Sequence, residues 1–186
     1  RGDRQAHRSE ARLSGMDFSL SEEQAAFKKS VYDFAKKELD PRGTGPHSAM
    51  YEREKKGEFF AEGLKKAAEF GILALPIPEQ YGGLGLDKVS TACVGEQLGL
   101  LPSFAGSLGA HTSIGTLPIV YFGTDDQRQR YLPRLANGEL IGAFALTEPE
   151  AGSDALSARM TATLTPDGKH YSLRGQKLWI TNGGFA

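Results

Sequence analysis

The chain has 186 residues, of which 39% are hydrophobic and 24% charged, and its formal net charge is −1. This composition is typical of a soluble globular protein with one ordinary domain, or one small domain and part of another. The near-neutral charge argues against nucleic acid as a partner, and no apolar run approaches the roughly 20 residues of a transmembrane helix. The single cysteine, Cys93, excludes an internal disulfide framework and suits a reducing compartment.

Residues 1–15 carry four arginines but only one large aliphatic residue, Leu13. They lack the amphipathic apolar face of a transit peptide and include Asp3 and Glu10. We expect a disordered extension here, either vector-derived or upstream of the native start, with Met16 as that start.

Residues 16–140 are expected to form an all-α domain. Ser21 with Gln24, and Thr124 with Gln127, each match a capping box, in which two side chains satisfy two free backbone N–H groups at a helix start. Apolar residues then recur at helical spacing after each box.

Other helix boundaries in this domain follow from proline, glycine and aspartate. The first helix is expected to end at Asp40, because a residue before proline is pushed out of the helical region. A second helix at about 58–70 should end at Gly71, which can adopt a left-handed conformation. A third should begin at Asp87 and be stopped by Pro102. The remaining expectations are a glycine-interrupted helical segment at about 103–115 and a helix end at Asn137-Gly138.

From residue 139 the pattern changes to strand-length runs and two-residue alternation. Strands are expected at 140–147, 160–165, 171–173 and 176–181, with a turn at Pro166-Asp-Gly168. The predicted fold class is therefore α+β, with a helical bundle followed by the first strands of an antiparallel sheet. Three or four strands are too few for an independent β domain, so we expect residues 141–186 to begin a domain that this chain does not complete.

Two segments near the end of the chain suggest a common chemistry. The first, the Thr147 segment, is Phe144-Ala-Leu-Thr-Glu-Pro-Glu-Ala-Gly-Ser-Asp154, and the second, the Trp179 segment, is Lys177-Leu-Trp-Ile-Thr-Asn-Gly183. For either segment alone, ordinary strand threonines and a core tryptophan would be about as good an explanation as a cofactor site. Their joint occurrence favours a cofactor with a flat, hydrogen-bonding ring system.

A flavin has this character, since its ring edge needs hydrogen-bond donors and its faces need apolar walls. Thr147 and Thr181 each end an apolar run and offer a neutral hydroxyl donor. Trp179 lies two residues before Thr181 and is expected on the same strand face, where it could cover the ring. Gly152-Ser153 could bring a backbone N–H and a hydroxyl to a pyrophosphate.

Other possible sites are weaker. The loop glycines Gly83 and Gly85 lack the third glycine of a dinucleotide fingerprint. The four histidines are scattered, so no metal site is expected, and His111 is interpreted as a packed core residue rather than part of a site. Glu148 and Asp154 could form an acid–base pair, but a role in stabilising a turn is preferred.

The two segments resemble the flavin-site signatures of the acyl-CoA dehydrogenase family. Residues 16–186 follow the family in order, and so many motifs in sequence are specific to it. The other matching stretches are Met16-Asp-Phe-Ser-Leu-Ser-Glu-Glu-Gln24, Phe70-Gly-Ile-Leu-Ala-Leu-Pro76, Pro78-Glu-Gln-Tyr-Gly-Gly-Leu-Gly85, Phe122-Gly-Thr-Asp-Asp-Gln127 and Tyr131-Leu-Pro-Arg-Leu-Ala-Asn-Gly138.

The resemblance implies an all-α amino-terminal domain, a β-barrel-like middle domain and a helical carboxy-terminal domain, with FAD between the last two. Thr147 would then bond the pyrimidine edge of the flavin, Trp179 would pack on the ring and Thr181 would bond near N5. Ser153 would meet the pyrophosphate and lie near the acyl-CoA thioester. Phe144 stands where several members have tyrosine, so a contact through its backbone would survive and one through a phenol would not. The implied cofactor-binding residues are Phe144, Leu146, Thr147, Gly152, Ser153, Trp179, Ile180 and Thr181.

The family's reaction is α,β-dehydrogenation of an acyl-CoA thioester in fatty-acid β-oxidation. Its catalytic base is a glutamate of the carboxy-terminal domain, which is expected beyond Ala186, so no glutamate of this chain is assigned that role. Residues 1–186 alone are accordingly expected to be inactive. The stretches 109–115 and 167–173 are most similar to the long- and very-long-chain branch.

The resemblance further implies electron-transfer flavoprotein as acceptor, a homo-oligomer when complete, and a location in the bacterial cytoplasm or the mitochondrial matrix. Two alternatives remain open. One is a related flavoenzyme on the same fold, such as an acyl-CoA oxidase or a flavin monooxygenase. The other is a non-enzymatic scaffold or assembly protein.

Overall fold

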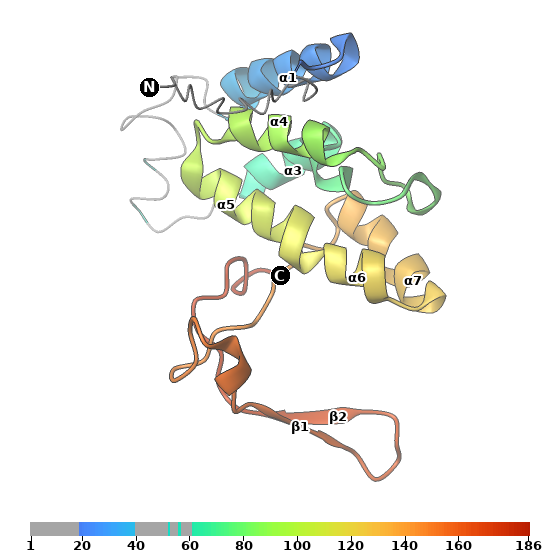
Figure 1. The fold of residues 1–186 in the computed structure, drawn as a ribbon, viewed down its shortest axis with the longest axis vertical. Helices are drawn as coiled ribbons and strands as arrows, with labels where there is room; N and C mark the ends of the chain where they lie inside the picture. The colour runs from blue at the N-terminus through green and yellow to red at the C-terminus, as the bar shows by residue number, and fades with distance from the viewer. Residues whose placement is uncertain (1–18, 40–51, 53–55, 57–60) are drawn as a thin grey trace, which may run out of the picture.

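The structure is a computed structural model that describes residues 19–39, 52, 56 and 61–186 (Figure 1). The expectations for residues 1–15, for Met16 and for a helix end at Asp40 lie outside these residues, as does the predicted start of the second helix near residue 58.

Helices occupy the first part of the described chain and a single hairpin the last (Figure 1). The α-helices are α1 (Glu22–Phe34), α3 (Ala61–Glu69), α4 (Lys88–Leu98), α5 (Pro102–Ala110), α6 (Leu117–Phe122) and α7 (Asp125–Ala136). Two π-helical turns, η1 (Ala35–Leu39) and η4 (His111–Gly115), extend α1 and α5, and three short 3₁₀ turns are η2 (Ile72–Ala74), η3 (Glu79–Tyr81) and η5 (Ala155–Ser157). The strands are β1 (Thr161–Leu164) and β2 (Tyr171–Arg174).

The predicted capping boxes are confirmed. The Gln24 backbone N–H donates to Ser21 Oγ at 3.1 Å, and the Ser21 N–H donates to Gln24 Oε1 at 3.0 Å. The pair at the start of α7 behaves alike, with 3.3 Å from Gln127 N to Thr124 Oγ1 and 2.9 Å for the reciprocal bond. Both helix starts thus follow from local sequence.

One helix start and one whole helix differ from expectation. Pro102 does not merely stop the preceding helix, since it is the first residue of α5, where its missing N–H costs no hydrogen bond. Helix α6 was not anticipated, because its six residues are too few to show a helical apolar period. Gly71, in contrast, follows α3 with φ of 89°, as the prediction of a left-handed glycine requires.

The core lies inside the helical region. Its main cluster joins apolar side chains of α1, α3, η2, α4 and α5, and a second cluster joins η2 to α7. Leu73 and Leu132 have no exposed surface, and Leu98 has 1%. No helix in the described ranges is both long enough and apolar enough to cross a membrane.

The hairpin forms as predicted, with β1 and β2 antiparallel and Thr161 opposite Arg174. The expected strands at 140–147 and 176–181 are wrong, because these residues join no strand ladder in the structure. Their apolar runs have the length of strands, but neighbouring strands must also pair with them. Figure 1 shows this part of the chain as extended loops and a hairpin that project from the helical region.

Candidate functional site

The Thr147 and Trp179 segments meet in the structure, although not as paired strands. The Leu178 backbone N–H donates to the Thr147 carbonyl oxygen at 2.8 Å. The Lys177 ammonium donates to the Leu146 carbonyl oxygen at 2.8 Å and to Glu148 Oε1 at 2.8 Å. These bonds bring together two segments that lie about thirty residues apart in the sequence.

Glu148 is the centre of this junction. Its side chain is 7% exposed and accepts hydrogen bonds from Lys177 Nζ and from the backbone N–H groups of Arg159, at 2.6 Å, and Met160, at 3.0 Å. The Lys177 hydrogen bond, aided by these N–H groups, lowers the pKa of Glu148 from 4.5 to about 2. A carboxylate held in its charged form by three partners suits the turn-stabilising role and is a poor general base.

Glu148 also begins a tight turn that presents Gly152 and Ser153. The Glu148 N–H donates to the Ala151 carbonyl at 3.0 Å, and the Ala151 N–H donates back at 3.2 Å. Gly152 and Ser153 follow this turn and are both exposed, and a Cβ placed on Gly152 would meet nothing within 4 Å. The turn therefore leaves room for a ligand to approach the backbone at Gly152.

Trp179 does not take the position predicted for it. Its φ is 58°, a left-handed value that is uncommon for a bulky residue, and its side chain is 87% exposed. Because the segment is not a strand, the expectation that Trp179 shares a strand face with Thr181 is wrong.

The other predicted flavin residues of the two segments differ in exposure. Thr181 is exposed, while Ile180 and Thr147 are half-buried. Phe144 and Leu146 are 40% and 44% exposed.

A second set of contacts ties this region to the helices. His111 in η4 is fully buried, its Nδ1 accepts the Gly142 backbone N–H at 2.9 Å, and its Nε2 lies 3.1 Å from the Leu135 carbonyl oxygen. Accepting from Gly142 requires an unprotonated Nδ1, so the ring is neutral and Nε2–H donates to Leu135. Burial lowers the pKa of His111 from 6.5 to about 4. The prediction that His111 is a packed residue is confirmed.

Asn182 completes this attachment. Its side chain is 5% exposed, and Nδ2 donates to the carbonyl oxygens of Ser107 in α5, at 2.9 Å, and Gly142, at 3.1 Å. Sequence reasoning gave no role to Asn182 or Lys177, although both lie within the Trp179 segment. Their partners are distant in sequence, and the sequence pattern alone carried no signal for these contacts.

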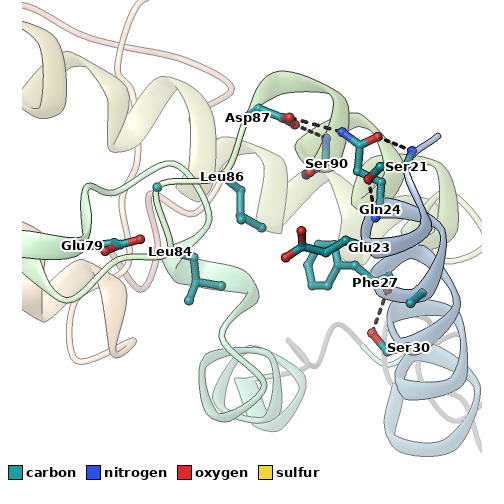
Figure 2. A pocket seen from close by; sticks show the side chains of 12 residues that line it. Ser21, Glu23, Gln24, Phe27, Ser30, Glu79, Leu84, Leu86, Asp87 and Ser90 are labelled. Carbon is teal, nitrogen blue, oxygen red and sulfur yellow. Dashed lines mark hydrogen bonds between the residues drawn. The ribbon is translucent and has the colours of Figure 1, made fainter. Parts of the chain in front are cut away.

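A separate groove of about 860 Å³ lies between α1 and residues 79–90. Figure 2 shows Phe27, Leu84 and Leu86 lining it, with Gln24 bonded to Asp87 across one end. None of the predicted cofactor residues lines this groove, so it is distinct from the junction of the two segments.

The residues at the junction fit a flavin. Phe144, Leu146 and Trp179 present exposed apolar surface, and the Thr181 and Ser153 side chains are exposed hydroxyl donors. The nearby charges of Lys177 and Glu148 are already paired with each other. Apolar side chains and neutral hydroxyl donors are the chemistry that a flat, uncharged ring requires.

Comparisons with known proteins point the same way. Residues 21–139 match the profile described as "Acyl-CoA dehydrogenase, N-terminal domain", and residues 143–186 match "Acyl-CoA dehydrogenase, middle domain". The chain is 45% identical over 168 residues to an acyl-CoA dehydrogenase of Bacillus subtilis, covering 90% of this chain and 42% of that protein. It is 42% identical over 168 residues to the mitochondrial very long-chain specific acyl-CoA dehydrogenase of Bos taurus, covering 90% of this chain and 25% of that protein.

Among solved structures, an acyl-CoA dehydrogenase of Bacillus anthracis complexed with FAD superimposes with a TM-score of 0.83 at 45% identity. The match covers 90% of this chain and 28% of that chain. The chain therefore spans less than half the length of these relatives.

Proposed function

The chain belongs to the acyl-CoA dehydrogenase family, and from this premise we propose that it supplies the helical domain and one half of the FAD site of an acyl-CoA dehydrogenase. The observation that carries the proposal is the junction itself. Leu178 and Lys177 bond to the backbone of the Thr147 segment, so the residues expected to bind flavin come from two segments held against each other.

The proposed roles follow from what each side chain exposes. Thr147 and Thr181 provide neutral donors for the ring edge, and the exposed indole of Trp179 provides an apolar wall. Gly152 and Ser153 offer backbone N–H and hydroxyl donors to the pyrophosphate, in a turn with space beside the glycine. Phe144, Leu146 and Ile180 complete the apolar lining.

When bound, FAD would accept the hydride that leaves the β-carbon of the acyl-CoA thioester. The residues of this chain would orient the flavin, exclude water from its face and hold Ser153 near the thioester. They do not supply the base that removes the α-proton. Glu148 is a poor candidate, because its carboxylate already accepts bonds from Lys177, Arg159 and Met160. We therefore assign no residue of this chain as that base.

The wider assignments rest on the family and on the relatives. Likeness to the very long-chain enzyme of Bos taurus supports a long acyl chain as substrate. Electron-transfer flavoprotein is the proposed acceptor, and a homo-oligomer is the proposed state of the complete enzyme. Relatives are bacterial and mitochondrial, so we assign the protein to the bacterial cytoplasm or, in a eukaryote, to the mitochondrial matrix.

The test is to purify the whole protein to which these residues belong and to measure its flavin spectrum and its turnover. We expect a bound flavin band, bleached by long-chain acyl-CoA, with electrons passing to electron-transfer flavoprotein. Rapid reduction of oxygen would favour an acyl-CoA oxidase, and absence of flavin would favour a scaffold protein. Residues 1–186 produced alone should show neither tight FAD binding nor turnover.

A further inference from the structure

Asn182 is buried where the Trp179 segment meets the helices. Its Nδ2 bridges the Ser107 carbonyl oxygen of α5 and the Gly142 carbonyl oxygen, which lies just before the Thr147 segment. Carbonyl oxygens only accept hydrogen bonds, so both of these contacts require the –NH₂ group of an amide. A single side chain thus links three parts of the chain.

The points to which Asn182 is bonded are themselves fixed. The Gly142 N–H is bonded to the buried His111 ring, and Gly142 packs directly on the backbone of η4. A Cβ placed on Gly115 would lie 2.8 Å from the Gly142 carbonyl carbon, which shows how closely the two backbones approach. Ser107 lies within α5, and two other residues of this helix, Phe104 and Leu108, belong to the core.

The Trp179 segment is therefore held at both ends. Lys177 and Leu178 fix its start to the Thr147 segment, and Asn182 fixes its end to the helices. Trp179 and Asn182 both have positive φ, at 58° and 69°. Such conformations persist only where the surrounding contacts impose them, and for tryptophan the cost is higher than for asparagine.

The side-chain oxygen of Asn182 indicates that this residue has a role beyond packing. Asn182 Oδ1 is buried and has no hydrogen-bond partner in the described part of the chain. A buried acceptor without a donor is unfavourable, and an apolar residue would avoid it. The asparagine is thus explained by what its –NH₂ group does.

We propose that Asn182 is a positioning residue that locks the Trp179 segment to the helical domain, so that Trp179 and Thr181 are held ready for the flavin before it binds. The inference rests on the proposed function and adds a residue to it. Preorganisation of this kind improves affinity because the ordering cost is met before the ligand arrives.

Three substitutions in the whole protein separate the amide from the backbone conformation. Asn182→Gly removes the side chain and tolerates the left-handed φ, and Asn182→Asp keeps the size and the φ but loses the donors. Asn182→Ala loses the donors and is also strained at this φ. The matched control is Asn137→Asp, because exposed Asn137 uses only its Oδ1, as acceptor of the Glu139 N–H.

Two measurements apply to each variant: the dissociation constant for FAD, and hydrogen–deuterium exchange of the 178–183 amides in the protein freed of FAD. If Asn182 locks the Trp179 segment in this way, Asn182→Gly and Asn182→Asp both weaken FAD binding by about tenfold, the value of one net hydrogen bond. Both also speed exchange at 178–183, while α1 exchanges as in the wild type and shows that the domain is folded. Asn137→Asp changes neither quantity.

The inference is overturned if Asn182→Gly and Asn182→Asp bind FAD and exchange like the wild type while only Asn182→Ala is impaired. In that case the backbone conformation alone matters. A wild-type protein that binds no FAD would instead contradict the proposed function, and the two failures are therefore distinguishable.

Discussion

The helical region and residues 143–186 are stabilised in different ways. Leu73, Ile77 and Leu132 are fully buried among the helices. Among residues 143–186, all of which the structure describes, Ala151 is the only buried hydrophobic residue, while Leu156 and Trp179 are 99% and 87% exposed. The first region forms a closed apolar core. The second is held by hydrogen bonds and by the partly buried ion pair of Lys177 and Glu148.

This difference separates stability from site geometry. Apolar burial is non-directional and is the dominant favourable term in folding. Hydrogen bonds at Glu148 and Asn182 are directional and fix where a few backbone atoms lie. Substitutions among the helices should therefore lower the free energy of unfolding, whereas substitutions at these two residues should loosen the candidate site in a folded protein.

The largest effect is expected from Leu73→Ala. Leu73 has no exposed surface and lies in the main core cluster, so the truncation should lower the free energy of unfolding by about 2–5 kcal/mol. Chemical denaturation measures this change. The same substitution at Leu156, which is 99% exposed, is the matched control and should change stability by less than about 0.5 kcal/mol. Equal losses of unfolding free energy at the two leucines would refute the contrast between the helical core and residues 143–186.

Acid should weaken the helical region through His111. Burial lowers its pKa in the folded state to about 4, while the unfolded chain keeps 6.5, so the unfolded state binds a proton first. The stabilisation is complete above pH 6.5 and is lost as the pH falls from 6.5 to 4, a change of about 3 kcal/mol. Unfolding free energies measured across this range check the slope. A flat profile for the wild type across this range would contradict a buried, neutral His111.

Glu148→Gln should affect the site more than the fold. The neutral amide can accept fewer of the bonds from Lys177 and the backbone of Arg159 and Met160, so the turn loosens and FAD affinity falls by about tenfold. Equilibrium titration of the whole protein with FAD measures the change. Glu150→Gln alters an exposed glutamate two residues away and should bind FAD as the wild type does. An equal loss of FAD affinity in both variants would show that removal of a negative charge, rather than the hydrogen bonds of Glu148, is the cause.

The smallest effect is expected from Thr124→Ala at the start of α7. Removing the cap hydroxyl frees the Gln127 N–H and should cost about 1 kcal/mol of unfolding free energy, with FAD affinity unchanged. Thr124→Ser retains the hydroxyl and serves as control in the same thermal and FAD titrations. A loss of FAD affinity in Thr124→Ala would show that the two regions are not separable in this way.

Local features of the sequence predicted much of the fold. Both capping boxes, the left-handed Gly71 and the hairpin around Pro166-Asp-Gly168 depend on residues a few positions apart, and the structure confirms each. The predicted strands at 140–147 and 176–181 failed because a ladder needs partners that an apolar run does not reveal.

The site was predictable only in part, and for the same reason. The sequence motifs identified the two segments but not the turn of Trp179 into a left-handed conformation, which removes it from the face expected for a strand. The anchors Lys177 and Asn182 bond to atoms far away in sequence, Asn182 to Ser107 and Gly142. Contacts of this kind depend on the tertiary fold rather than on spacing.

FAD is expected to bind where the Thr147 and Trp179 segments meet. The most direct test is hydrogen–deuterium exchange of the whole wild-type protein with and without saturating FAD. We predict that FAD slows exchange at residues 144–153 and 177–183 and leaves α1 unchanged. Unchanged exchange in both segments, with protection instead along the groove between α1 and residues 79–90, would contradict it.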